Sequence, residues 1–264
     1  MFQKDVPLRL YSNYKIGGKA KFFYCAQGLA PLLEALKKAK QEQLPLFVLG
    51  GGTNLLISDD GFAGLVLKPE IKFLHQQENI IYAGAGVAMG ELLNFAATQG
   101  LSGLEWAGGL PGTIGGAIRG NAGAFGGEIK DAVQEVISVS LEAPPRLICR
   151  SGKECGFSYR NSLFKEKNDE IIIAAAFQLR LGEPEEIRAA GQEKINYRHQ
   201  RHPLEHPNIG SIFKNVSWEK VPAAHQAVFQ NKIKQDPFPI LPTAVLVDAC
   251  GLKGVSYGGA MVSP

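Results

Sequence analysis

The glycine-rich stretch from Gly103 to Gly127 constrains this chain more than any other feature of its sequence. It reads GLEWAGGLPGTIGGAIRGNAGAFGG, and aliphatic and aromatic side chains are threaded through it. A flexible linker lacks such side chains, so the segment is predicted to be folded. Because glycine has no Cβ, a run of this kind lets the backbone approach a ligand or another backbone closely.

A second glycine loop stands earlier in the chain, where the apolar run LPLFVLG leads into GGGTNLL. The pattern predicts a buried strand followed by a tight loop whose backbone N–H groups converge on an anion such as a pyrophosphate. Taken alone, the loop is explained equally well as an ordinary glycine turn. The candidate cofactor-binding residues here are Gly50, Gly51, Gly52, Thr53, Asn54 and Leu55.

Two further bare-backbone loops, GLPGTIGGA and NAGAFGGE, follow one another inside the glycine-rich stretch. Their glycines recur too regularly for chance turns, and together with the first loop they suit a long, flat cofactor that carries phosphates. Their candidate cofactor-binding residues are Pro111, Gly112, Thr113, Gly115, Gly116, Asn121 and Gly123.

The stretch YAGAGVAMGELL is the main alternative cofactor motif, because it follows a predicted strand and precedes a predicted helix. Its glycines, Gly84, Gly86 and Gly90, are spaced G-x-G-x-x-x-G, one residue longer than the dinucleotide-binding fingerprint. We therefore interpret them as structural glycines that pack a strand against a helix.

Composition places the chain among soluble globular proteins, with 45% hydrophobic and 20% charged residues in a length of 264. The net charge of +3 is small and the basic residues are scattered, which argues against a nucleic-acid partner. The four cysteines lie far apart and form no C-x-x-C pair, which argues against a disulfide framework or a zinc cluster. The N-terminus does not resemble a signal peptide and no apolar run reaches the ~18 residues of a membrane span. We expect a cytoplasmic, monomeric protein that does not bind membranes.

The chain contains both helical and strand-like patterns, and we expect an α+β fold. We expect a first domain of two α/β subdomains over residues 1–182 and a smaller α/β lobe over residues 183–264. The boundary is placed where a polar helix opens at Pro184 and the composition then shifts toward proline, histidine and asparagine. Within the lobe the patterns predict a strand from Ser211 to Phe213, a helix in PTAVLVDACG and a strand at GGAMVS.

Six segments together carry a resemblance to a known family: SNYKIGGKA, GGGTNLL, the glycine-rich stretch, FSYRNSLF, GSIFKN and GLKGVSYGGAMVS. In this order and approximate spacing, the chain resembles the UDP-N-acetylenolpyruvoylglucosamine reductases. The resemblance implies an FAD-binding domain of the vanillyl-alcohol-oxidase type with noncovalent FAD. It also implies that NADPH reduces the flavin, which then reduces UDP-N-acetylglucosamine enolpyruvate to UDP-N-acetylmuramate. That reaction serves peptidoglycan synthesis, and with it cell-wall formation, cell shape and cell division.

The same resemblance assigns roles to residues outside the glycine loops. Arg160 in FSYRNS and Ser211 in GSIFKN match the family's cationic stabiliser and general acid, and are the candidate catalytic residues. Tyr159, Lys214 and Asn215 are the candidate substrate-binding residues. Without the family pattern, an arginine after a tyrosine is more often a surface ion-pair residue, and a serine after a glycine more often caps a turn.

His199, His202 and His206 are spaced like metal ligands. Pro203 interrupts any helix that would align the three rings, and the remaining ligands of a metal site are missing. We expect no metal, and interpret this cluster as a partly basic surface near the UDP diphosphate.

The sequence departs from the family pattern at two places. Val216 follows GSIFKN where the family usually has proline, and the sequence stops at GGAMVSP, before the family's final helix and glutamate-bearing strand. The catalytic glutamate of that strand has no equivalent here, so we expect FAD binding, a loosely packed second lobe and little turnover. The alternatives are a flavin oxidase of the same superfamily that acts on an alcohol or sugar, and an FAD-binding protein with little activity.

Overall fold

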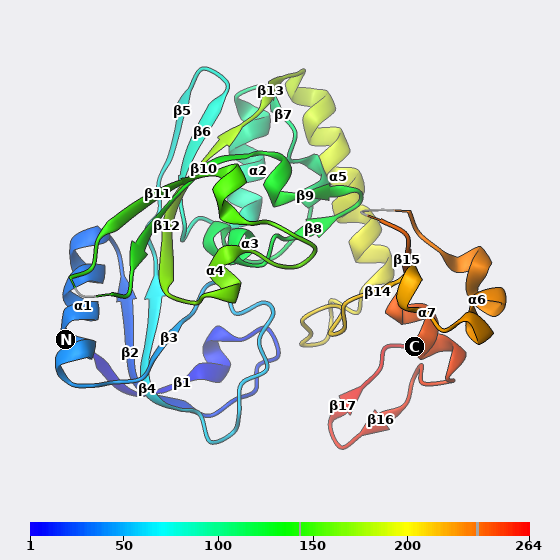
Figure 1. Cartoon of the computed structure of the whole chain (residues 1–264), viewed down its shortest axis with the longest axis horizontal. Coiled ribbons are helices and arrows are strands. Elements are labelled where there is room, and N and C mark those ends of the chain that lie inside the picture. Colours follow the sequence, from blue (N-terminus) through cyan, green and yellow to red (C-terminus); the bar gives the residue numbers. More distant parts are fainter. Residues whose placement is uncertain (143, 236–237) are drawn as a thin grey trace. The chain divides into compact units, whose positions relative to one another are not determined.

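The computed structural model of the chain describes residues 1–142, 144–235 and 238–264. These residues form two compact units, Met1–His202 (unit 1) and Pro203–Pro264 (unit 2). Each unit contains both helices and strands, so the predicted α+β class is confirmed (Figure 1).

The first part of unit 1 is a four-stranded sheet covered by one helix. Its strand order is β1-β2-β4-β3, with β1 antiparallel to β2 and the other pairs parallel. The elements are β1 (Gln3–Pro7), η1 (Leu8–Tyr11), β2 (Lys19–Ala26), α1 (Leu29–Gln41), β3 (Leu46–Val48) and β4 (Phe62–Pro69). Helix α1 follows from the spacing of Leu32, Ala35, Leu36 and Ala39, which all lie buried along one side of it.

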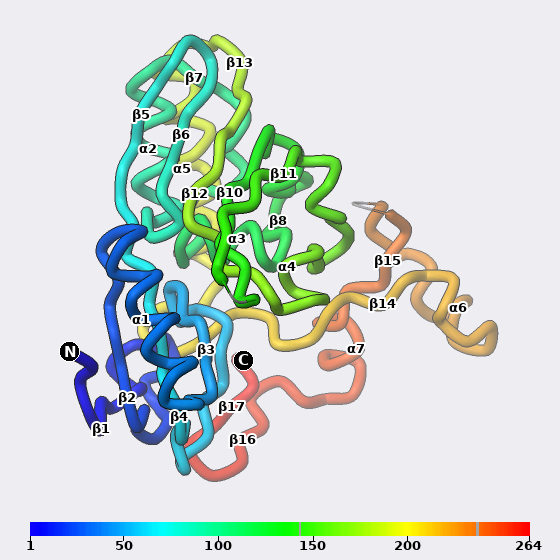
Figure 2. The backbone as a smooth tube through the Cα atoms, turned by 60° about the vertical axis from the view of Figure 1, so that its left-hand side comes forward, coloured from blue at the N-terminus to red at the C-terminus, as the bar shows by residue number. Residues whose placement is uncertain are grey.

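The second part of unit 1 is a five-stranded antiparallel sheet with the order β11-β10-β12-β6-β5. Its strands are β5 (Leu74–Gln77), β6 (Ile80–Gly84), β10 (Val133–Ser140), β11 (Leu147–Ser151) and β12 (Glu170–Gln178). The central strand β12 sets the register, because Ala175 lies opposite both Val136 of β10 and Ala83 of β6. Side chains of β10 and β12 also pack against α1, which joins the two parts of unit 1 through one core. Figure 2 shows α1 and strands β1–β4 below the strands of the second sheet in that view.

Short elements carry the glycine-rich stretch across the second sheet. Those of the stretch are η2 (Glu105–Ala107), α3 (Ile114–Arg119), β8 (Gly123–Ala124) and β9 (Gly127–Glu128). The other short elements of unit 1 outside the stretch are α2 (Met89–Thr98), β7 (Leu101–Ser102), η3 (Ile129–Asp131), η4 (Gly152–Cys155), α4 (Leu163–Glu166) and β13 (Arg180–Leu181). The apolar residues of α2 and α3 share a core with those of β6 and β12. The glycine-rich stretch is therefore folded, as its side chains predict.

Helix α5 (Pro184–Arg201) belongs to unit 1, whereas the composition shift predicts a domain boundary at residue 183. The helix packs on α2 and η2, as Figure 1 shows. Arg198 donates from Nε to the Gly108 carbonyl at 2.9 Å, and Tyr197 meets the Phe125 ring edge to face at a centroid distance of 5.3 Å. These contacts hold the polar helix against the glycine-rich stretch, and the domain boundary at residue 183 stays a prediction.

Unit 2 consists of short elements with little buried surface. They are β14 (Val216–Ser217), η5 (Trp218–Lys220), α6 (Ala223–Phe229), η6 (Gln230–Lys232), β15 (Ile240–Leu241), α7 (Thr243–Ala249), β16 (Ser256–Tyr257) and β17 (Ala260–Met261). The helix predicted in PTAVLVDACG is confirmed as α7, and the strand predicted at GGAMVS as β17.

Two strand predictions are corrected by the structure. Residues 211–213 form no strand, and Ile212 and Phe213 are exposed, because regular pairing in this segment begins only at β14. The run LPLFVLG does form β3, but the strand lies at the sheet edge and Phe47 and Val48 are exposed. An apolar run shows that a strand forms, while its place in the sheet decides how much of it is buried.

Candidate functional site

The first glycine loop and the glycine-rich stretch meet in unit 1. A Cβ on Gly51 would lie 2.7 Å from the Cα of Gly112, and one on Gly112 would lie 2.9 Å from the Thr53 hydroxyl oxygen. The first gap, between two backbones, is tighter than a real Cβ tolerates, and Gly112 has a φ of +109° that also favours glycine. Two motifs that are far apart in the sequence are therefore brought into one site.

The segment SNYKIGG closes the other side of the first loop. Gly52 has a φ of +65°, and a Cβ there would lie 1.7 Å from the Tyr11 carbonyl oxygen. The N–H of Asn13 donates to the Gly52 carbonyl at 3.0 Å. Only glycine fits at position 52, both for its left-handed backbone and for the space.

The N–H groups of this loop are available for a ligand. Across the described parts of the chain, the N–H groups of residues 50–54, and those of Gly112 and Thr113, donate no hydrogen bond. Gly115 differs, because its N–H donates to the Ala85 carbonyl at 2.9 Å. Successive N–H donors on bare backbone form a concave anion site, so this donor set fits the pyrophosphate of a dinucleotide such as FAD.

The turn that carries Arg160 is attached to the glycine-rich stretch. Ser158 and Asn161 exchange both backbone hydrogen bonds, at 3.1 and 3.0 Å, which places Tyr159 and Arg160 at the tip of a tight turn. Arg160 has a φ of +56°, uncommon for a residue with a side chain and typical of tight turns and functional sites.

Three hydrogen bonds hold this turn in place. The Asn121 amide donates to the Ser158 carbonyl at 2.9 Å, the Ser162 hydroxyl donates to the Arg119 carbonyl at 2.7 Å, and Arg160 Nη2 donates to the Gly123 carbonyl at 2.7 Å. The predicted catalytic arginine therefore lies against a predicted cofactor loop.

Asn121 takes part in the framework of the site. Its side chain is fully buried, and besides the bond to Ser158 its Oδ1 accepts from the Lys130 N–H at 3.3 Å. It fixes the loop from inside, so its predicted contact with a cofactor would have to come from its backbone.

Glu128 is a functional candidate that the sequence did not single out. Its side chain is 9% exposed, and Oε1 lies 4.0 Å from Arg160 Nη1 while Oε2 lies 2.5 Å from Lys130 Nζ. The tight fit extends to Gly123, where a Cβ would lie 2.8 Å from Glu128 Cγ and 3.0 Å from Arg160 Nη1. A glutamate directly after a glycine loop, with an arginine motif downstream, is the signal that could have found it.

Of the predicted site residues in unit 2, two are exposed and one is partly buried. Ser211 and Lys214 are exposed, and the Lys214 carbonyl accepts from the Thr243 hydroxyl at 2.6 Å. Asn215 is partly buried and its Oδ1 accepts from the Thr243 N–H at 3.2 Å, at the start of α7. Through these two hydrogen bonds, Thr243 links the GSIFKN segment to the start of α7.

The glycines of the alternative dinucleotide motif have a packing role. A Cβ on Gly84 would lie 2.2 Å from the Ile71 carbonyl oxygen, and one on Gly86 would lie 2.8 Å from the Glu70 Cα. Both glycines therefore face the backbone between β4 and β5, whereas Gly90 has open space around it. Their interpretation as structural glycines holds for the first two, although they pack on a connecting segment instead of a helix.

The histidine cluster does not form a joint site in the described residues. Helix α5 ends at Arg201, next to Pro203, as proline predicts. Burial, and then the charge of Arg198, lower the pKa of His202. Within the described ranges, no group of three or more histidine, cysteine, aspartate or glutamate side chains is arranged to hold a metal ion. In the same ranges, no helix has the length and hydropathy needed to cross a membrane.

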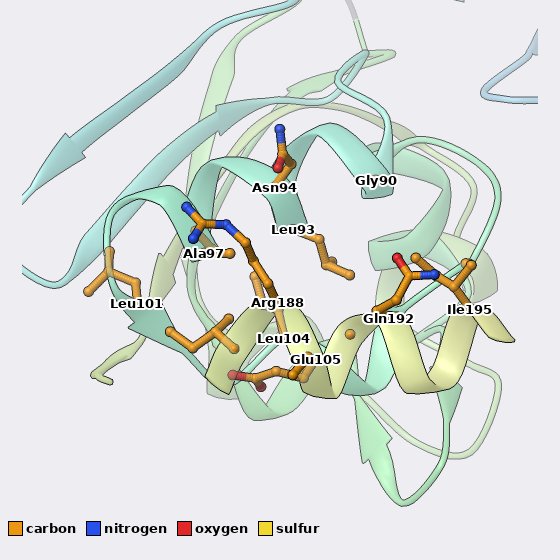
Figure 3. A pocket seen from close by; sticks show the side chains of 15 residues that line it. Gly90, Leu93, Asn94, Ala97, Leu101, Leu104, Glu105, Arg188, Gln192 and Ile195 are labelled. Atoms are coloured by element: carbon orange, nitrogen blue, oxygen red, sulfur yellow. The ribbon is translucent and has the colours of Figure 1, made fainter. Parts of the chain in front are cut away.

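A cavity of about 430 Å³ lies between α2 and α5, and Leu104, Glu105 and Gly109 of the glycine-rich stretch also line it. In Figure 3 the Arg188 side chain extends from α5 toward α2 over a floor that includes Leu101 and Leu104. At the edge of the cavity, the Glu105 carboxylate accepts a hydrogen bond from the Gly103 N–H at 2.9 Å. None of the predicted catalytic or cofactor residues lines this cavity, so we do not assign the cofactor to it.

Comparisons with known proteins identify the domains of the chain. An FAD-binding-domain model matches residues 20–141, and a model of the C-terminal domain of UDP-N-acetylenolpyruvoylglucosamine reductase matches residues 202–264. The first match covers β2 to β10 and contains both glycine loops. The fold and the matched domain place the chain in the class of FAD-binding oxidoreductases.

Relatives narrow this class to one family. The chain is 37% identical to the UDP-N-acetylenolpyruvoylglucosamine reductase of Lactobacillus delbrueckii subsp. bulgaricus, over 99% of the chain and 80% of the relative. It is 35% identical to the same enzyme of Caldanaerobacter subterraneus subsp. tengcongensis, over 97% of the chain and 77% of the relative. The solved MurB structure from Thermus caldophilus matches with a TM-score of 0.77 and 28% identity, over 100% of the chain and 85% of that structure. The chain belongs to the UDP-N-acetylenolpyruvoylglucosamine reductase family.

Proposed function

We propose that this chain binds FAD noncovalently and, with NADPH as reductant, reduces UDP-N-acetylglucosamine enolpyruvate to UDP-N-acetylmuramate. The observation that carries the proposal is the attachment of the Arg160 turn to the same glycine-rich stretch whose backbone N–H groups are available for an anion. A cation beside a dinucleotide site is the arrangement that flavin-dependent reduction of an anionic substrate requires.

The glycine loops would hold the cofactor. Bound FAD would supply the hydride chemistry between NADPH and the vinyl carbon of the substrate. The N–H groups of residues 50–54, with those of Gly112 and Thr113, are the donors for its pyrophosphate. Leu55, Pro111, Gly116 and the Gly123 backbone complete the proposed cofactor surface.

Arg160 and Ser211 are the proposed catalytic residues. The guanidinium of Arg160 stabilises the negative charge that grows next to the substrate carboxylate as hydride arrives, because it remains charged at all working pH values. The Ser211 hydroxyl donates the proton that the adjacent carbon needs. Tyr159, Lys214 and Asn215 are the proposed contacts for the rest of the substrate.

In the cell, this reaction would serve peptidoglycan synthesis, and with it cell-wall formation, cell shape and cell division. We propose a cytoplasmic monomer. The cytoplasmic location is supported by the free thiols of Cys25, Cys149, Cys155 and Cys250, because a reducing compartment keeps thiols unpaired.

FAD binding tests the first half of the proposal. The folded chain should quench flavin fluorescence on titration, and Gly51→Val should abolish this because the valine side chain would collide with the Gly112 backbone. Gly90→Val is the matched control, since a Cβ there meets open space, and it should retain FAD affinity. A folded, unchanged chain without FAD affinity would exclude the proposed function.

Separate measurement of the two half-reactions tests the proposed catalytic activity. Anaerobic stopped-flow absorbance should show flavin reduction by NADPH and then reoxidation by the enolpyruvyl substrate. Ser211→Ala should leave the first rate nearly unchanged and slow the second by about 10² to 10⁴, the usual contribution of a general acid.

Ser217→Ala, in the same unit, is the control and should change neither rate. Equal slowing of both stages by Ser211→Ala would show that Ser211 positions the flavin instead of supplying a proton. Rapid reoxidation by oxygen, with no acceleration by the enolpyruvyl substrate, would favour the flavin oxidase alternative.

A further inference from the structure

Glu128 is a buried carboxylate beside Arg160 that the proposed mechanism does not yet use. Its side chain is 9% exposed. A buried carboxylate is costly unless cations compensate it, and here each oxygen faces a different one. Oε2 lies 2.5 Å from Lys130 Nζ and Oε1 lies 4.0 Å from Arg160 Nη1.

The backbone around Glu128 makes its position rigid. The residue ends β9, its N–H donates to Asp131 Oδ2 at 2.8 Å, and its strand partner across the hairpin is Gly123. Gly123 in turn accepts the Arg160 Nη2 hydrogen bond at 2.7 Å. One two-stranded hairpin therefore contacts the guanidinium through both a backbone carbonyl and a carboxylate.

Arg160 needs such support, because its own attachment is slight. The side chain is 38% exposed and projects from the tip of a tight turn, at a left-handed residue. Apart from Glu128, its guanidinium interacts with the Gly123 carbonyl and stacks 5.2 Å from the Tyr159 ring centre. An arginine side chain has several rotatable bonds, so a second anchor greatly restricts its orientation.

We propose that Glu128 is a positioning residue, which holds the guanidinium of Arg160 in the orientation that meets the substrate carboxylate. The inference rests on the proposed function only in the role it gives Arg160. Nη2 is engaged by Gly123 and Nη1 is drawn toward Glu128, so the direction of the planar group is set from two sides before substrate arrives. Lys130 contacts the other oxygen and holds the carboxylate in place.

The test compares Glu128→Gln, which keeps the shape and removes the charge, with Glu142→Gln. Glu142 forms an exposed ion pair with Arg146 at 2.9 Å and lies outside the site, so its variant is the matched control. Glu128→Gln should slow flavin reoxidation by the enolpyruvyl substrate by about 10- to 100-fold, the usual cost of losing an outer-shell partner. Reduction by NADPH should stay within about twofold, because hydride transfer to the flavin does not use Arg160.

A double-mutant cycle separates positioning from general destabilisation. Arg160→Lys should slow reoxidation by itself, and adding Glu128→Gln to it should cause little further slowing, because the partner that Glu128 positions has already been lost. Glu128→Asp keeps the charge, retracts it by one methylene and should recover part of the rate. It also serves as the working variant if Glu128→Gln fails to fold.

A second readout does not depend on turnover. Phenylglyoxal modifies accessible guanidinium groups, and mass spectrometry of the peptide that contains Arg160 gives its rate of modification. Arg160 should react faster in Glu128→Gln than in the unchanged chain, and at the unchanged rate in Glu142→Gln.

The outcomes distinguish the two proposals. If Arg160→Lys slows reoxidation but Glu128→Gln does not, or if the two changes multiply in the double variant, the positioning role is wrong and the proposed function stands. If the unchanged chain is not reoxidised by the enolpyruvyl substrate, or Arg160→Lys leaves the rate unaltered, the proposed function fails at this residue. The phenylglyoxal rates then decide alone whether Glu128 holds Arg160.

Discussion

Units 1 and 2 use the same kinds of residue in different ways. Unit 1 has three apolar clusters built from sheet, helix and loop residues, whereas only Val221, Ile240 and Leu241 are buried among the described residues of unit 2. Large apolar side chains such as Phe213 and Tyr257 are 65% and 93% exposed in unit 2. The expectation of a loosely packed second lobe agrees with this burial, while low turnover stays a prediction.

Glycines make the same contrast clearer. In unit 1 a Cβ on Gly51 or Gly52 would collide with the backbone of another segment, whereas a Cβ on Gly210, Gly254 or any other described glycine of unit 2 meets nothing within 4 Å. Glycine serves close approach in unit 1 and turn formation in unit 2. The difference shows that close packing fixes the glycine loops of unit 1, and it can be tested by substitution.

The largest expected effect is the loss of a core side chain. Phe177→Ala should destabilise unit 1 by about 3 to 5 kcal/mol, because Phe177 is fully buried and its removal leaves a cavity. Phe213→Ala in unit 2 should change stability by less than about 0.5 kcal/mol, as exposed substitutions do. Trp106 and Trp218 lie one in each unit, so urea unfolding followed by fluorescence in a Trp218→Phe or Trp106→Phe background reports each unit separately. Similar costs for the two changes would mean that Phe213 is buried in solution.

The next largest effect separates close approach from backbone conformation. Gly52→Ala combines a left-handed backbone, costing about 1 to 2 kcal/mol, with overpacking against Tyr11, costing about 1 to 3 kcal/mol. It should also weaken FAD binding, measured by fluorescence titration. Gly210→Ala has a similar φ of +71° but open space, so it should cost only the first amount and leave FAD affinity unchanged. If the Gly52 change were no worse than the Gly210 change, the tight packing of the loop would be disproved.

A third contrast concerns ion pairs. In unit 1 the Glu170 side chain, 3% exposed, accepts hydrogen bonds from Arg150 and Ser138. Arg150→Met should cost about 2 to 3 kcal/mol, less than for a fully buried pair because Arg150 is partly exposed. Glu205→Gln breaks an exposed pair with His206 in unit 2 and should cost almost nothing. Urea unfolding with the single-tryptophan reporters gives both values, and equal costs would show that burial does not decide the strength of these pairs.

The smallest effect is pH dependence at the end of unit 1. Burial, and next the charge of Arg198, lower the pKa of His202 in the folded chain, so folding favours the neutral ring. The stability that this provides is present above the ordinary histidine pKa of about 6.5 and is lost as the pH falls through the lower pKa of the folded state. His202→Gln should reduce the pH dependence of the urea midpoint for unit 1 unfolding over this range. His225→Gln in unit 2 should leave that pH dependence unchanged. A His202→Gln profile as steep as that of the unchanged chain would contradict the assignment.

The sequence predicted the main features of unit 1 through patterns that depend on local chemistry. The apolar spacing of α1 and the α+β class are confirmed by the structure, and the family resemblance by the comparisons. The roles of Arg160 and Ser211 rest on the resemblance and remain predictions. Glu128 escaped notice because its importance depends on Arg160, which lies over thirty residues away in sequence, and the two motifs were not considered together.

What the sequence determined by itself was which segments become helix, strand or bare-backbone loop, because spacing, capping and the missing Cβ act within a few residues. Only the tertiary structure decided that β3 lies at an edge, that α5 packs with unit 1, and that Gly51 meets Gly112. The physical reason is that burial and close approach belong to pairs of segments, and no single segment records its partner. Arg160 and Glu128 show the same dependence within the candidate site, because their charges meet only after the hairpin and the turn have packed together.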